Sequence, residues 1–242
     1  MEQFKRVIAL LGKEGFEKIK QTTVLVIGTG GVGSFAIEAL VRSGIGHLIL
    51  IDNETYEPTN INRQWPANTK NIGKYKVDVI AAECKKINPE FIIETSKEKL
   101  TKNNYENVIL SLTKRDIFAL RQALGDSENL YVIEAIDDLK VKSLLIEWLY
   151  SNEIKFISSM GAANVTDITS IKYADLFKTH YCVLARIIRD ELKKKNIRKG
   201  IPVVYSDQKR LDIHKGQKGS IMPVTAIFGL YLANWVMQEI TN

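Results

Sequence analysis

Cysteine is scarce in this chain of 242 residues, and its two cysteines, Cys84 and Cys182, lie far apart in the sequence. Two distant cysteines supply neither a CxxC pair, the usual half of a zinc knuckle, nor a disulfide framework. The sequence therefore predicts no zinc site, and it favours a reducing compartment such as the cytoplasm. We interpret Cys182 as a buried helix thiol and not as a nucleophile.

Long apolar runs are also missing. Residues 1–6 open an amphipathic pattern in place of the apolar core of a signal peptide. Residues 221–236 are apolar, but Pro223 and Asn234 interrupt them, and the run is shorter than the roughly 20 residues that span a bilayer. We expect no membrane span and a buried C-terminal helix.

Proline is sparse and low-complexity tracts are absent, while 45% of the residues are hydrophobic and 26% are charged. This is the composition of an ordinary folded protein. We expect a single domain over residues 1–242, with a core at residues 22–160 and a substrate-facing extension at residues 161–242. The formal net charge of +6 suits a polyanionic partner.

Strand and helix patterns alternate after residue 22. Strands are predicted at residues 23–28, 47–52, 91–95, 130–135 and 155–160, and helices at residues 32–43, 74–88 and 139–151. Gly44 is the natural end of the first of these helices. The alternation predicts a Rossmann-like, mainly parallel α/β sheet with helices on both faces, which binds its ligand at the carboxyl ends of the strands.

The rest of the chain departs from this repeat. Residues 4–19 predict one or two short helices. Residues 100–125 hold an apolar run at 108–112 and a predicted helix at 115–124. The extension is expected to form short strands at 170–176 and 202–206 and two helices, at 180–195 and 224–240.

A glycine-rich turn follows the first predicted strand and opens a helix, the context that a phosphate-binding turn needs. Its glycines are Gly28, Gly30, Gly31 and Gly33. Glycine lets phosphates approach the backbone, and the helix N-terminus attracts their charge. Asp52 ends the second strand, where a carboxylate accepts bonds from ribose hydroxyls. These features alone fit an NAD-dependent dehydrogenase as well as an ATP enzyme.

Two cations behind Asp52 favour a triphosphate. Arg63 can bind phosphate oxygens with two prongs, and Lys76 adds a compact charge as negative charge moves onto departing pyrophosphate. Asn62 can orient the nucleotide. An NAD site calls for neither cation beside the glycine turn.

A third element, Glu-Ala-Ile-Asp-Asp at residues 134–138, ends a predicted strand at the same edge. Asp137 is a candidate ligand for a Mg²⁺ ion that bridges the phosphates, because Mg²⁺ prefers one or two carboxylates plus substrate oxygens. Asp138 opens the next helix and is expected to cap it.

These motifs, in this order, resemble the adenylating domain of the ubiquitin-activating-enzyme-like proteins, the ThiF/MoeB-type adenylyltransferase superfamily. The resemblance implies ATP bound with Mg²⁺, a homodimer, and an N-terminal arginine that reaches the nucleotide of the neighbouring subunit. Arg6 stands where that arginine is expected. Sulfur-carrier activators in this superfamily typically carry two CxxC zinc pairs, which this chain lacks.

Outside those motifs the chain resembles the bacterial tRNA threonylcarbamoyladenosine dehydratase family. The similar segments are residues 44–46, 87–90, 174–179, 184–192, 203–206 and 224–229. The chain departs from that family at Glu134, where aspartate is usual, at Met160, which interrupts a usually glycine-rich turn, at Cys182, and over residues 100–125, which are longer.

This resemblance implies that ATP adenylates the threonyl carboxylate of a modified adenosine beside the anticodon, and that the group then cyclises with loss of water. The group carries both the carboxylate and the urea atoms that attack it. Effective molarities of such ring closures can reach about 10⁵ M, so no enzyme thiol is required.

Basic residues late in the chain suit a tRNA partner. The candidates are Lys193, Lys194, Lys195, Arg198 and Lys199. Three alternatives stay open: a sulfur-carrier adenylyltransferase, a non-catalytic nucleotide- or RNA-binding scaffold, and an NAD dehydrogenase. The sequence also leaves open whether a sulfur-relay protein assists the reaction.

Overall fold

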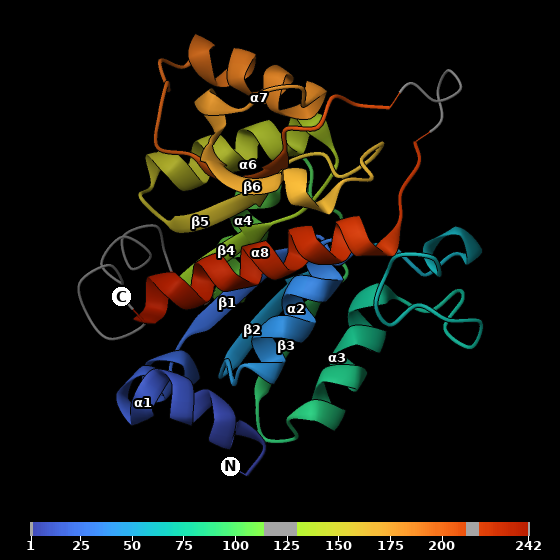
Figure 1. The fold of residues 1–242 in the computed structure, drawn as a ribbon, viewed down its shortest axis with the longest axis vertical. Helices are drawn as coiled ribbons and strands as arrows, with labels where there is room; N and C mark the ends of the chain where they lie inside the picture. Colours follow the sequence, from blue (N-terminus) through green and yellow to red (C-terminus); the bar gives the residue numbers. More distant parts are fainter. Residues whose placement is uncertain (1, 114–129, 212–217, 242) are drawn as a thin grey trace.

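The computed structural model describes residues 2–113, 130–211 and 218–241, and its centre is a seven-stranded sheet in the order β3-β2-β1-β4-β5-β7-β6 (Figure 1). The strands are β1 (Thr23–Ile27), β2 (His47–Ile51), β3 (Ile92–Ser96), β4 (Leu130–Glu134), β5 (Lys155–Ser159), β6 (Ile171–Asp175) and β7 (Pro202–Ser206). Among the pairs of these described strands, only β6–β7 is antiparallel. The predicted Rossmann-like fold, with short added strands, is confirmed.

Helices cover both faces of the sheet, as predicted. One face carries α1 (Lys5–Lys20), α2 (Gly33–Arg42), α3 (Lys76–Ile87) and α8 (Met222–Thr241), and the other carries α4 (Tyr105–Thr113), α6 (Leu139–Ser151) and α7 (Val183–Lys194). Successive β1 residues serve different faces, because Val24 and Val26 join the first core and Leu25 and Ile27 the second. β1 is therefore buried on both sides, which explains its continuous apolar sequence.

The C-terminal helix α8 is buried along α2, as its apolar sequence predicts (Figure 1). Gly229 makes the approach possible, because a Cβ atom there would lie 2.8 Å from the backbone nitrogen of Ala36 and would also overlap the carbonyl oxygen of Val32. Among the described residues, no helix has the length and apolar character needed to cross a membrane.

The N-terminal segment forms a short 3-10 helix at Glu2–Phe4 and then α1, which is kinked at Gly12 where φ is 74°. Two helical pieces are thus confirmed. Phe4 and Phe16 pack on each other and against Gly44, which has φ of 92° just past the end of α2. Ile45 donates its backbone N–H to Leu40, so Gly44 ends α2 as predicted.

Two helices begin two or more residues later than predicted. α3 starts at Lys76 instead of residue 74, because Gly73 has φ of 81° and Tyr75 is extended and bridges Thr55. α7 starts at Val183 instead of residue 180, because Tyr181 has φ of 52° and Cys182 is extended. The helix predicted at residues 115–124 lies outside the described residues.

We expect Gly229→Ala to lower the free energy of unfolding by about 1–3 kcal/mol, because the added methyl group meets backbone atoms of α2 that cannot move aside. Urea unfolding followed by circular dichroism measures this. Gly161→Ala is the matched control, since the nearest atom to its added Cβ is at 3.6 Å. Equal stability of the two variants would contradict the close approach.

Candidate active site

The glycine-rich turn joins β1 to α2 at the carboxyl edge of the sheet. Gly28 has φ of 90°, and a Cβ atom there would lie 2.7 Å from the carbonyl oxygen of Ala135, which follows β4. A Cβ on Gly33 would overlap the carbonyl of Gly28. Both positions therefore need glycine, and the turn they close faces the N-terminus of α2, where an anion is favoured.

Asp52 binds the glycine turn to the loop that follows β2. Its Oδ2 accepts the backbone N–H of Thr29 at 2.7 Å and the Thr29 hydroxyl at 3.0 Å, and its Oδ1 accepts the backbone N–H of Glu54 at 2.9 Å. Asp52 thus lies beside the turn, at the place where a ribose-binding carboxylate is expected.

Arg63 packs against the glycine turn. A Cβ on Gly31 would lie 3.3 Å from the Arg63 carbonyl oxygen and 3.4 Å from its Cγ. The Arg63 guanidinium donates to the carbonyl of Thr59 at 2.7 Å and to Oδ1 of Asn62 at 3.0 Å. Asn62 in turn donates to the carbonyl of Ser220 at 2.9 Å, so the extension meets the nucleotide motif here.

Lys76 is buried, with an exposed fraction of 2%. Its Nζ lies 2.5 Å from Oε2 of Glu54, whose side chain is 64% exposed. Because Glu54 is also bonded to Asp52 through its backbone, Asp52 and Lys76 are joined by one residue. The solvated carboxylate can turn to water while the ammonium donates to a phosphate in its place.

Asp137 follows β4, the neighbour of β1 in the sheet, two residues beyond the carbonyl that touches Gly28. Its carboxylate is exposed, and it has no hydrogen bond or ion pair with any residue in the described ranges. One exposed carboxylate beside the glycine turn fits the donor set of Mg²⁺, which takes its other oxygens from substrate and water. Asp138 instead caps α6, accepting the backbone N–H of Lys140 at 3.0 Å and of Val141 at 3.1 Å, as predicted.

Arg6 lies too far away to serve its own glycine turn. It is an exposed residue of α1, the helix that packs at the Gly44 end of α2. α2 has ten residues and so separates the two ends by about 15 Å.

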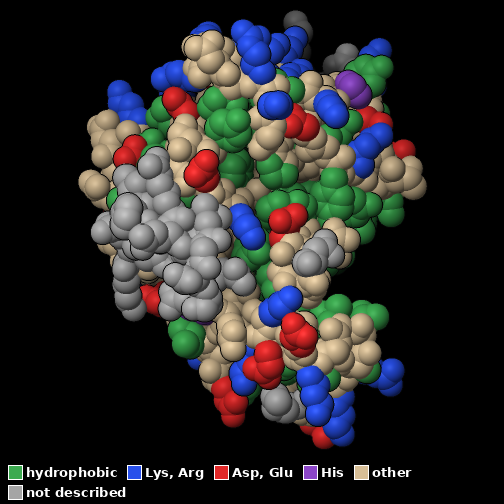
Figure 2. All heavy atoms as spheres, turned by 90° about the vertical axis from the view of Figure 1, so that its left-hand side faces the viewer, with side chains coloured by type: hydrophobic (Ala, Val, Ile, Leu, Met, Phe, Trp, Pro, Cys, Tyr) green, Lys and Arg blue, Asp and Glu red, His purple; other side chains and the backbone are tan. Residues whose placement is uncertain are grey.

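The five basic tRNA candidates lie at the end of α7 and just beyond it, and all are exposed. The other end of α7 lies at the carboxyl edge of the sheet, where Cys182 approaches Gly161. Twelve residues of helix place the two ends about 18 Å apart. Lys195 pairs with Glu147 of α6 at 3.3 Å and Lys194 with Glu191 at 2.7 Å. Figure 2 shows Lys and Arg side chains gathered at this end of the molecule.

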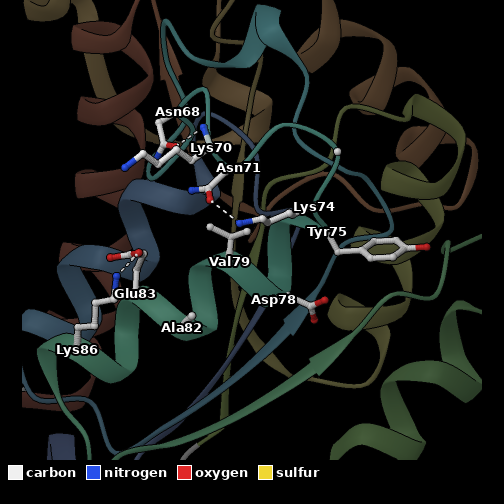
Figure 3. Close-up of a pocket in the computed structure, with 11 residues that line it drawn as sticks. Asn68, Lys70, Asn71, Lys74, Tyr75, Asp78, Val79, Ala82, Glu83 and Lys86 are labelled. Atoms are coloured by element: carbon white, nitrogen blue, oxygen red, sulfur yellow. Dashed lines mark hydrogen bonds and ion pairs between the residues drawn. The ribbon is translucent and has the colours of Figure 1, made fainter.

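A separate groove of about 680 Å³ runs along the outer side of α3 (Figure 3). Its lining includes Asn71, Lys74, Tyr75 and Asp78, but none of the residues predicted for the nucleotide site. In Figure 3 the Glu83 and Lys86 side chains pair with each other at one end of it. The groove is therefore not the predicted nucleotide cradle.

Sequence reasoning missed three residues that complete the cradle: Thr29, Glu54 and Thr225. Thr29 lies within the glycine motif, and Glu54 lies two residues after Asp52. Their closeness in sequence to predicted site residues could have identified both. Thr225 of α8 touches Gly31 and donates to the Arg63 carbonyl at 3.3 Å. No local pattern links it to a motif so distant in the sequence.

Both cysteines are buried, as expected for Cys182. Cys182 immediately precedes α7 and has an exposed fraction of 4%. Burial, helped by the charges of Glu38 and Glu83, raises the pKa of the Cys84 thiol to about 12. A thiolate at Cys84 is therefore absent near neutral pH.

The fold agrees with comparisons to known proteins. A model of the ThiF family matches residues 4–242. The chain belongs to the ThiF family. Within it, the chain is 39% identical over 215 residues to a tRNA threonylcarbamoyladenosine dehydratase of Bacillus subtilis, an alignment that covers 89% of this chain and 78% of the relative.

A solved structure of the Escherichia coli tRNA N6-threonylcarbamoyladenosine dehydratase in complex with AMP is similar over 99% of this ThiF-family chain and 94% of its own, with 30% identity and a TM-score of 0.86. The same enzyme in complex with ATP also superposes with a TM-score of 0.86. A yeast dehydratase is 30% identical, and the chain spans 57% of its length.

In the folded protein we expect neither cysteine to react with a thiol reagent at pH 8.5, because that pH lies well below the raised pKa of Cys84 and Cys182 is covered. Unfolding returns the thiols to an ordinary pKa of about 8.5, and both then react. Counting released chromophore in buffer and in guanidinium measures the difference. Rapid native modification of either thiol would contradict this assignment.

Proposed function

We propose that this ThiF-family protein is a cytoplasmic, ATP-dependent tRNA threonylcarbamoyladenosine dehydratase. The observation that carries the proposal is the similarity over nearly its whole length to a dehydratase whose structure is solved with AMP and with ATP. The assembly of Asp52, Arg63, Lys76 and Asp137 around the glycine turn supports the same chemistry.

The reaction has two steps. A carboxylate oxygen of the threonyl group attacks the α-phosphorus of ATP, and pyrophosphate leaves. A urea atom of the same group then attacks the activated carbonyl carbon, loses its proton as the ring closes, and AMP leaves. The modified nucleoside has lost one water, and ATP has been split to AMP and pyrophosphate.

Each side chain of the cradle has a role in the first step. The glycine turn admits the phosphates, Asp52 accepts the ribose hydroxyls and Asn62 orients the nucleotide. Arg63 and Lys76 stabilise the charge that develops on pyrophosphate. Asp137 would hold Mg²⁺, which neutralises phosphate charge and polarises the α-phosphoryl group when bound.

The second step needs no nucleophile from the protein, because attacker and acceptor belong to one substrate group. The burial of both cysteines is consistent with a reaction that uses no enzyme thiol. Cys84 is a buried residue of α3 that faces the core, and Cys182 is covered just before the start of α7. Neither is placed to receive an acyl group.

We propose a homodimer in which Arg6 serves the partner's nucleotide. Its distance from its own glycine turn supports action across subunits. Along α8 and beside it the surface exposes five large apolar side chains: Ile168, Tyr173, Ile221, Met222 and Leu230. An apolar face of this kind suits a second copy of the chain.

We propose that tRNA lies along α7. The basic cluster at the far end of α7 lies some 18 Å from the carboxyl edge of the sheet. This distance is about the length of five nucleotides of one strand, at roughly 3.4 Å each. The cluster would then bind phosphates of the stem while the anticodon loop enters the site.

The decisive assay is incubation with ATP, Mg²⁺ and tRNA that carries threonylcarbamoyladenosine, followed by nucleoside mass analysis. We expect the loss of one water. An unchanged mass, together with pyrophosphate exchange that depends on a Gly-Gly-ended protein, would favour a sulfur-carrier adenylyltransferase instead. No ATP turnover with either substrate would favour a scaffold.

Two adjacent carboxylates give this assay a matched pair. Asp137→Ala is expected to lower turnover by on the order of 10²–10³-fold without a change in stability, because its carboxylate has no partner within the described residues. Asp138→Ala is expected to keep turnover but to lose about 1 kcal/mol of stability with the helix cap. The reverse pattern would exclude Asp137 from the chemistry.

Replacing Lys193, Lys194 and Lys195 by alanine should reduce the slope of log affinity for tRNA against log salt by about 1 for each lysine that contacts a phosphate. Fluorescence anisotropy at several salt concentrations measures the slope. Replacing the exposed Lys13, Lys18 and Lys20 of α1 changes the net charge equally and is the control. Equal slopes for both triple variants would place tRNA elsewhere.

A further inference from the structure

A buried ion pair lies directly beneath the Asp137 turn. Glu134, the last residue of β4, and Lys142 of α6 pair with each other, and both side chains have an exposed fraction of 0%. In the part of the chain that the structure describes, every other ion pair has at least one partly exposed partner. A second group, the Ser158 hydroxyl of β5, donates to Oε2 of Glu134 at 2.5 Å.

Stability alone does not account for this pair. Removing two charges from water costs free energy that their attraction only repays when the geometry is good, and apolar residues of similar volume are often as stabilising. The contacts that Glu134 and Lys142 make to the surrounding backbone therefore give the better explanation of the pair.

What it holds is the peptide on either side of Ile136. Oε1 of Glu134 accepts the backbone N–H of Ile136 at 3.0 Å, while Nζ of Lys142 donates to the Ile136 carbonyl at 3.1 Å. The donor and the acceptor of one residue are thus fixed by two opposite charges that are themselves paired. The peptides that flank Ile136 cannot rotate without breaking one of these two hydrogen bonds.

Ile136 links the glycine turn to Asp137. On one side, the residues before Asp137 pack on Gly28. A Cβ atom added to Gly28 would lie 2.7 Å from the carbonyl oxygen of Ala135 and 3.0 Å from Cγ2 of Ile136. On the other side is the Asp137 carboxylate, which has no partner of its own in the described residues. The direction of that carboxylate is therefore set by its backbone, and an error of about 1 Å at a reacting group can cost on the order of 100-fold in rate.

We propose that Glu134, Lys142 and Ser158 are positioning residues that aim Asp137 at the phosphate side of the glycine turn. The inference rests on the proposed function in so far as Asp137 is taken to hold Mg²⁺ for adenylation. Glu134 and Lys142 do not touch the substrate; they act through the Ile136 peptides.

The test uses the full-length protein with Glu134→Leu/Lys142→Met as the main variant. It removes both contacts to Ile136 and leaves no unpaired charge in the core. A positioning role predicts a melting temperature close to that of the parent, a 10- to 100-fold lower kcat for dehydration, a much smaller change in KM for ATP, and a higher Mg²⁺ concentration for half-maximal rate. A purely structural role predicts that a double variant as stable as the parent also has the parental activity and the parental Mg²⁺ requirement.

Two single variants keep the test decisive if the double variant does not fold. Glu134→Asp retains the charge and is expected to retain most of the activity and a near-parental Mg²⁺ requirement. Ser158→Ala removes one hydrogen bond to Glu134 and is expected to lower kcat two- to fivefold with a measurable rise in Mg²⁺ requirement. Parental kcat and Mg²⁺ requirement in Ser158→Ala and in any folded Glu134/Lys142 variant would overturn the proposal.

A readout without turnover separates this inference from the proposed function. Isothermal titration calorimetry gives the affinity for ATP with and without Mg²⁺. Positioning predicts that the gain in ATP affinity on adding Mg²⁺ shrinks in the double variant and in Asp137→Ala alike. If the parent fails to dehydrate tRNA, the proposed function fails, while a shrunken gain in the variants still supports the positioning network and an unchanged gain overturns it.

Discussion

The close contact between Gly28 and the carbonyl of Ala135 is the constraint on which the rest of the site depends. β1 and β4 are parallel neighbours, so the turns that follow them must share one small space at the carboxyl edge. With hydrogen in place of a side chain, the phosphate turn and the Asp137 turn pack as one layer. Asp52 adds the loop after β2 to this layer through Thr29.

Glycine also allows close backbone contacts at two other positions. Gly33 lets α2 begin immediately beside the turn, and Gly229 lets α8 lie close on α2. Thr225, four residues earlier in α8, then reaches Gly31 and Arg63. The buried C-terminal helix therefore supports the nucleotide site as well as the core.

Two ion pairs near the site differ in what they permit. The partner of Lys76 is a largely exposed glutamate, which water can solvate when the ammonium turns to a phosphate. The partner of Lys142 is fully buried, so separation would leave an unpaired charge in the core. Lys76 can therefore exchange its carboxylate partner for another anion, whereas Lys142 and Glu134 stay paired. The first pair has one solvated partner, and the second fixes the peptides of Ile136 that precede Asp137.

The sequence by itself determined the α/β alternation, the glycine turn, the helix cap at Asp138 and the candidate cluster of Asp52, Arg63, Lys76 and Asp137. These are local features, since periodicity, glycine and capping act within a few residues. Tertiary structure alone decided the helix starts at Lys76 and Val183, where the preceding backbone is extended or has positive φ. It alone also brought Thr225, Ser220 and Lys142 to the site, because their contacts arise from the packing of elements whose distance along the chain carries no sequence signal.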